Sequence, residues 1–152
     1  MSEEEKKAVK KAMDLLLQQD RTEKELSDRL YRGGFSEKAI ASAMAYVSSF
    51  GYIDDLRYAA NYLFYHKGQR SRKELQYKLL NKGVPKEIIA QAMEEYESED
   101  EYEALRNQLQ KRLKGRMPEE LTYEEKNKTI AYLARKGYSI SAIKAVMSEK
   151  QE

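Results

Sequence analysis

A nineteen-residue segment built around a glycine occurs three times in this chain, and it restricts the fold more than any other feature. The copies begin at Leu26, Leu75 and Thr129 and align without gaps, at offsets of 49 and 54 residues. Each copy places a leucine four residues before the glycine, an isoleucine six residues after it and a methionine ten residues after it. Self-similarity at such a period indicates tandem structural repeats. The chain is therefore predicted to be an array of three similar units.

The central glycines have the sequence context of a turn between two helices. Gly34, Gly83 and Gly137 each follow a helical pattern, where a residue in the left-handed conformation ends a helix and glycine is favoured. An apolar residue comes next, and then a serine or proline that can begin a helix. The isoleucine four residues past that start has the spacing of a hydrophobic staple. The same helix–turn–helix is thus predicted three times.

The first helix of each predicted pair begins at a capping box, in which a Ser or Thr is followed three residues later by Glu. These boxes are Thr22/Glu25, Ser71/Glu74 and Thr122/Glu125. The third box lies three residues further from its glycine, which predicts a helix about one turn longer. One more helical segment precedes each pair, at roughly 5–18, 54–66 and 98–114.

The composition agrees with an all-α fold. Only seven Gly and two Pro are present, and the segments between them contain mainly residues that favour helices, without the alternation typical of strands. We expect a tandem array of three three-helix repeats, elongated and curved, with domains at 1–50, 51–97 and 98–152. No apolar run approaches the ~20 residues of a membrane span, and no signal peptide is evident. These features predict a cytoplasmic protein without membrane contact.

Few residues could support catalysis or metal binding. The chain has no Cys and one His, which excludes disulfides, thiolate metal sites and a cysteine nucleophile. Asp54 and Asp55 form a carboxylate pair that we interpret as a helix cap and a first-turn acid, with metal or acid–base chemistry as the alternative. His66 is interpreted as an ordinary residue at a helix end. We expect no enzymatic activity, no cofactor and no metal.

The net charge of +2 conceals separate basic and acidic blocks. Six basic residues lie within residues 67–82, together with the single acid Glu74. They can be interpreted as a solvated helix face, or as a patch that contacts phosphates or an acidic protein. The acidic run at 94–103 is interpreted as the start of a helix, where negative charge is favourable.

The helix predicted at 54–66 also carries tyrosines on the side opposite to its alanines and leucines. Tyr58, Tyr62 and Tyr65 share this side at helical spacing. They could pack against a neighbouring repeat, or they could form an exposed aromatic ridge for bases or a protein partner.

Two stretches of the middle repeat resemble a known family. The run GYIDDLRYAANYL at 51–63 resembles the signature of the RecX family, regulatory proteins of the bacterial recombinase RecA. The family's next stretch is matched by Gly68, Arg70, Glu74-Leu75 and 82–84. The resemblance extends over nearly the whole chain. It is looser in the third unit, and Tyr58 stands where Phe is commoner.

The resemblance implies three tandem three-helix units, no enzymatic activity and binding to RecA filaments on single-stranded DNA. It further implies modulation, most often inhibition, of recombinase, ATPase and co-protease activity. We expect a monomer in solution that contacts the DNA directly or through the filament. A stand-alone DNA-binding array and a passive helical scaffold are the alternatives. The residues predicted to contact RecA or DNA are Arg57, Tyr62, Lys67, Arg70, Arg72, Lys73, Lys78 and Lys82.

Overall fold

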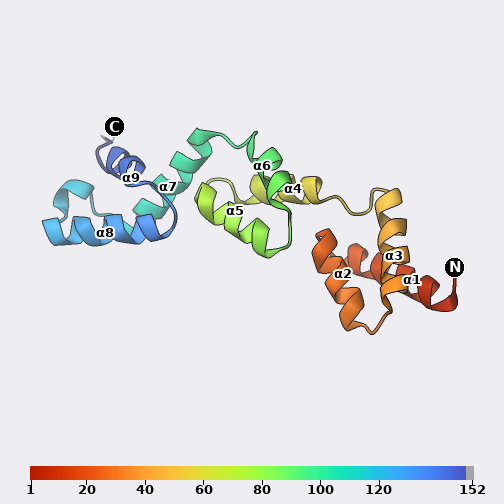
Figure 1. Cartoon of the computed structure of the whole chain (residues 1–152). Helices are drawn as coiled ribbons and strands as arrows, with labels where there is room; N and C mark the ends of the chain where they lie inside the picture. Colours follow the sequence, from red (N-terminus) through yellow and green to blue (C-terminus); the bar gives the residue numbers. More distant parts are fainter. Residues whose placement is uncertain (150–152) are drawn as a thin grey trace. The chain divides into compact units, whose positions relative to one another are not determined.

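The computed structural model describes residues 1–149, which form nine α-helices, one 3-10 turn and no strand (Figure 1). The first three helices are α1 (Glu3–Gln18), α2 (Glu23–Arg32) and α3 (Glu37–Ser49). The next three are α4 (Asp55–His66), α5 (Arg72–Asn81) and α6 (Lys86–Met93). The last group is α7 (Ser98–Leu113), the 3-10 turn η1 (Pro118–Glu120), α8 (Tyr123–Arg135) and α9 (Ile140–Met147). The predicted all-α class and three-helix repeats are confirmed.

The second helix of each repeat begins as the capping boxes predict. At Thr22 and Thr122 the side chain accepts the amide of the Glu three residues later, and that Glu accepts the Thr amide in return. At Ser71 the hydroxyl accepts the Glu74 amide at 3.1 Å, but the Glu74 carboxylate accepts from Arg70. The α8 helix has 13 residues where α2 and α5 have 10, which confirms the longer third helix.

The repeated glycines occupy the predicted left-handed turn. Gly34, Gly83 and Gly137 have φ of 87°, 92° and 104°. In each turn the amide of the next residue donates to the carbonyl of the leucine four residues before the glycine, over 3.1–3.4 Å. This bond satisfies a carbonyl that the end of the helix leaves without an intrahelical partner.

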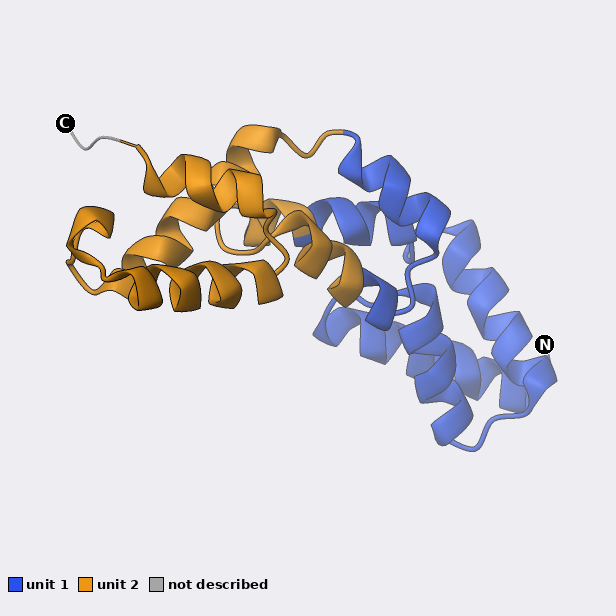
Figure 2. Ribbon diagram, turned by 60° about the vertical axis from the view of Figure 1, so that its left-hand side comes forward, with its two compact units in different colours: residues 1–62, 79–94 blue, residues 63–78, 95–152 orange. Residues whose placement is uncertain are grey.

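The chain divides into two compact units, shown in blue and orange in Figure 2. Unit 1 comprises residues 1–62 and 79–94, and unit 2 comprises residues 63–78 and 95–152. The middle repeat therefore contributes to both units. The predicted domain boundaries describe a different division of the chain and stay a prediction.

Each unit encloses the apolar core of one terminal repeat. In unit 1, α1 packs against α2 and α3, and small residues such as Ala8 and Ala43 are fully buried there. Their size permits a close approach of the helices, while Leu26 and Leu30 fill the core beside them. In unit 2, α7, α8 and α9 pack together around a core that includes Leu105. No helix within residues 1–149 is both long enough and apolar enough to cross a membrane.

Unit 1 also contains a contact between two consecutive repeats. The buried Thr22 hydroxyl donates to the Lys82 carbonyl at 2.5 Å, just before the glycine of the next turn. The Glu23 amide donates to Asp55 Oδ1 at 2.9 Å. Asp55 is thus more than the first-turn acid expected from the sequence, because it also satisfies a helix amide in the preceding repeat.

Unit 2 repeats this contact with equivalent residues. The buried Ser71 hydroxyl donates to the Lys136 carbonyl at 2.5 Å, just before Gly137. The Arg72 amide lies beside the Glu101 carboxylate and opposes the rise of its pKa, at the place where the Glu23 amide donates to Asp55. We call this arrangement the repeat joint. In it, the capped start of the second helix of one repeat contacts the glycine turn and the first helix of the next repeat. Each compact unit contains one such joint.

The glycines of the two joints lie against the preceding repeat. A Cβ on Gly83 would overlap Lys24, and a Cβ on Gly137 would overlap Ser71. At Gly34, by contrast, no atom of another repeat lies within 4 Å of the position that a Cβ would take. Glycine is therefore required at the joints for close approach as well as for its backbone conformation.

Replacing these glycines by alanine separates the two requirements. Gly34→Ala adds a Cβ at positive φ in open space, and it should destabilise the fold by about 1–2 kcal/mol. Gly83→Ala adds the overlap with Lys24, so its loss should be larger by at least about 1 kcal/mol. Unfolding in urea measures both losses. Equal losses would contradict the joint.

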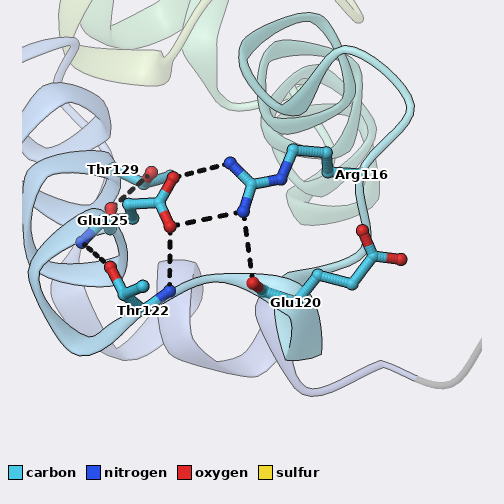
Figure 3. A network of polar contacts seen from close by, with 5 residues as sticks. All are labelled: Arg116, Glu120, Thr122, Glu125 and Thr129. Atoms are coloured by element: carbon cyan, nitrogen blue, oxygen red, sulfur yellow. Dashed lines mark hydrogen bonds and ion pairs between the residues drawn. The ribbon is translucent and has the colours of Figure 1, made fainter.

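The start of α8 is held by an ion pair of the third repeat (Figure 3). Arg116 donates to both carboxylate oxygens of Glu125, at 2.6 and 3.2 Å, and to the Glu120 carbonyl at 3.2 Å. The Thr122 amide donates to the same carboxylate at 3.0 Å. These donors, with Arg116 foremost, lower the pKa of Glu125 from 4.5 to about 2.

Because folding lowers this pKa, the charged Glu125 carboxylate stabilises the fold at every pH above 4.5, its pKa in the unfolded chain. This contribution is lost as the pH falls from 4.5 to about 2. Arg116→Gln should move the pKa of Glu125 back toward its ordinary value. NMR titration of the Glu125 side chain measures this shift. An unchanged pKa in the variant would show that the ion pair is not its main cause.

Candidate basic docking surface

In unit 2 the predicted cations lie on the loop after α4 and on α5. The loop is fixed to α7, because Asn107 donates to the Gly68 carbonyl at 2.9 Å and Gln108 donates to the Gln69 carbonyl at 2.7 Å. These two amides hold a loop that has no secondary structure of its own. The basic residues on either side are therefore presented from a fixed backbone.

The two arginines of this group are engaged within the unit. Arg70 donates to Glu74 at 2.7 Å, and both side chains are mostly covered. Arg72 donates to the Tyr96 carbonyl at 3.3 Å and its guanidinium lies 5.6 Å from the centre of the Tyr96 ring. Both side chains therefore have a structural role.

Glu101, from the acidic run, also lies beside Arg72. Burial raises the pKa of Glu101, while the Arg72 charge and backbone amide and the Lys73 charge oppose this shift. The acidic run begins α7 as predicted, with three acids in its first turn and Lys111 and Arg112 in its last. Glu101, together with Glu103 beside Gly68, thus places part of the acidic run next to the basic group.

The three lysines of the group behave differently from the arginines. Among residues 1–149, no carboxylate lies within ion-pair distance of Lys67, Lys73 or Lys78. Lys67 and Lys73 are exposed, and Lys78 is partly exposed. Their charges are available to an external partner.

Exposed aromatic side chains lie beside Lys67 at the end of α4. The Lys67 ammonium is 4.9 Å from the centre of the Phe64 ring, and Phe64 meets Tyr65 edge-on at 5.8 Å. Phe64 and Tyr65 are 64% and 73% exposed. A cation among exposed rings can contact either a protein surface or nucleobases.

The predicted tyrosine ridge does not have a single environment. Tyr58 is half-buried in unit 1, and burial followed by the charges of Glu25 and Asp20 raises its pKa to about 12. Its partial burial near these two acids of the first repeat agrees with the interpretation that the tyrosines face a neighbouring repeat. Tyr62 is partly covered, with the Lys82 ammonium 5.8 Å from its ring centre, whereas Tyr65 is exposed.

The remaining predicted residue, Arg57, lies in unit 1 at the start of α4. It is exposed, and its guanidinium donates to the Gly51 carbonyl at 3.0 Å. On either side of Gly51 stand Phe50 and Tyr52, whose rings stack at 5.5 Å, and Phe50 also meets Tyr46 at 4.9 Å. Sequence reasoning missed this aromatic group, because Tyr52 lies past the end of α3 and only the folded turn brings its ring onto Phe50.

The fold and the site together define a helical-repeat protein of three three-helix domains with a cationic surface on its middle repeat. Protein-family models match the chain in three stretches. Residues 8–46 match the first three-helix domain of RecX, residues 54–93 the second and residues 99–147 the third. The chain belongs to the RecX family.

Several curated relatives carry the name Regulatory protein RecX. The protein of Caldanaerobacter subterraneus subsp. tengcongensis is 34% identical over 95% of this chain and 71% of its own length. That of Vibrio campbellii is 32% identical over 93% of this chain and 90% of its own length. That of Clostridium botulinum (strain Eklund 17B / Type B) is 31% identical over 85% of this chain, and the match spans 61% of that relative's length.

Solved structures support the same fold. The crystal structure of RecX from Lactobacillus salivarius aligns with a TM-score of 0.84 over 97% of this chain and 96% of that one, at 23% identity. A second crystal structure, of a regulatory protein RecX, aligns with a TM-score of 0.82 over 96% of this chain and 72% of the other, at 22% identity. At these identities the likeness shows the fold alone.

The different environments of arginine and lysine lead to a stability prediction. Arg72→Gln removes a charged hydrogen bond and a cation–ring contact, and it should lower the free energy of unfolding by about 1–2 kcal/mol. Lys73→Gln, one residue away on the exposed side, should change it by less than about 0.5 kcal/mol. Thermal or urea unfolding of the two variants gives the comparison. Equal stability of both would remove the structural role of Arg72.

Proposed function

We propose that this chain binds RecA filaments on single-stranded DNA and inhibits their recombinase, ATPase and co-protease activities, without catalysis of its own. Membership of the RecX family and the resemblance of residues 51–63 to its signature support the regulatory role. The observation that carries the docking site is the set of three lysines without a carboxylate partner among residues 1–149. The protein would act in the cytoplasm.

Lysine and arginine have separate tasks in this proposal. Lys67, Lys73 and Lys78 would contact acidic side chains of the filament or phosphates of its DNA, because no carboxylate among residues 1–149 lies within ion-pair distance of them. Arg70 and Arg72 would position the loop and helix that carry the lysines. Arg57, Tyr62 and Lys82, in unit 1, are proposed as further contacts.

Charge reversal of the three lysines tests the docking site. A Lys67→Glu/Lys73→Glu/Lys78→Glu variant should fold normally and lose inhibition of DNA-dependent ATP hydrolysis by RecA, with binding weakened at least about tenfold. Its matched control is Lys7→Glu/Lys10→Glu/Lys11→Glu, since these α1 lysines are exposed and the net charge change is the same. The control should inhibit like the unaltered chain.

Co-sedimentation with RecA alone, with single-stranded DNA alone and with both identifies the partner. If the lysines meet phosphates on a single strand, reversal of all three should reduce the slope of log K against log salt by about 2. Full inhibition by the lysine variant would remove this surface from the mechanism. Binding to bare duplex DNA without any effect on RecA would favour a stand-alone DNA-binding array.

A further inference from the structure

The repeat joint is formed twice within the chain, and each of its halves occurs a third time without a partner among residues 1–149. Thr122 stands at the start of α8 as Thr22 and Ser71 stand at the starts of α2 and α5. Thr22 and Ser71 are fully buried against the turn of the following repeat, whereas Thr122 is exposed. Within the described chain, no glycine turn lies against Thr122.

The opposite half is open in the first repeat. Gly34 has the left-handed conformation of the two docked glycines, but nothing lies within 4 Å of the position that a Cβ would take. In both joints the carbonyl that accepts the hydroxyl belongs to the residue just before the glycine, which is Lys82 or Lys136. In the first repeat the residue at this position is Gly33.

We propose that these two open halves bind each other between copies of the chain, so that Thr122 of one copy docks on the Gly33–Gly34 turn of the next. The hydroxyl would donate to the Gly33 carbonyl. Such a contact is head-to-tail and adds copies in one direction.

Charge complementarity favours a second copy as the occupant. The residue two positions after the capping hydroxyl lies against the glycine in both joints, where it is Lys24 or Lys73. At the open half the corresponding residue is the exposed Glu124. The open glycine turn follows Arg29 and Arg32, which are both exposed. Opposite charges would therefore meet at the glycine turn in the contact between copies.

Exposed aromatic rings lie at both open halves. Tyr123 is 82% exposed beside Thr122, and Tyr31 is 72% exposed three residues before Gly34. Rings of this size gain free energy when a partner covers them. They give the proposed contact apolar area that the hydrogen bonds alone would lack.

The Arg116–Glu125 ion pair is compatible with docking (Figure 3). Glu125 is the third residue of its helix, as Glu74 is in α5, and Glu74 likewise pairs with an arginine, Arg70. The joint at Ser71 forms with that pair in place. A single joint is a small contact, so association should be weak and should require high concentration.

Sedimentation velocity over a wide range of protein concentration tests the proposal. The unaltered chain should show an average mass that rises steadily above one chain as concentration increases. Gly34→Asn tolerates the positive φ but places a side chain in the contact, and it should weaken association at least about tenfold. The matched control is Gly51→Asn, because Gly51 also has positive φ and open space around its Cβ position.

A charge exchange tests the orientation of the contact. Glu124→Lys and Arg32→Glu should each weaken association by about threefold to tenfold, and the double variant should recover most of the loss. A mass of one chain at every concentration would overturn the proposal. Equal effects of Gly34→Asn and Gly51→Asn, a mass that stops at two chains, or no recovery in the double variant would also overturn it.

Discussion

The structure depends on a hydroxyl group that serves two helices at once. Thr22 and Ser71 each accept an amide at the start of their own helix and donate to the last carbonyl before a glycine turn in the next repeat. Both side chains are fully buried. A buried hydroxyl without partners would be destabilising, so this geometry fixes how one repeat meets the next. Glycine at the turn lets the two backbones approach closely enough for the bond.

The joint also positions the basic surface. Ser71 begins α5 and ends the loop that carries Lys67, so the bond to the Lys136 carbonyl fixes one end of that loop. Asn107 and Gln108 hold the middle of the loop from α7. The lysines are thus displayed from a backbone anchored at several points, and the side chains of Lys67 and Lys73 are exposed. A docking protein benefits from such rigidity, because little backbone order is lost on binding.

Local features of the fold could be predicted from the sequence because their causes are local. The capping boxes at Thr22 and Thr122 and the left-handed glycines each depend on residues within one or two helical turns. The bond from Thr22 to Lys82 joins residues 60 apart, and no pattern in the sequence pairs them. For the same reason the role of Asp55 in capping α2 was missed.

The division of the basic group could not be predicted either. In the sequence Arg72 and Lys73 are adjacent cations, and only the packing of α5 against Tyr96 separates an engaged arginine from an exposed lysine. The aromatic group around Phe50 was likewise invisible to helical periodicity, because it continues past the end of α3. Composition and spacing identified where the charge lies, and the structure identified which charges are available.

Amide hydrogen exchange, followed by NMR in dilute solution, tests the repeat joint most directly. The amides of Glu23, Arg72 and Tyr123 all occupy the first position of a helix, where no intrahelical acceptor exists and exchange is ordinarily fast. The joint predicts slow exchange for Glu23, whose amide donates to Asp55, and for Arg72, whose amide lies beside the Glu101 carboxylate, and fast exchange for Tyr123. Similar, fast exchange at all three positions would contradict the account.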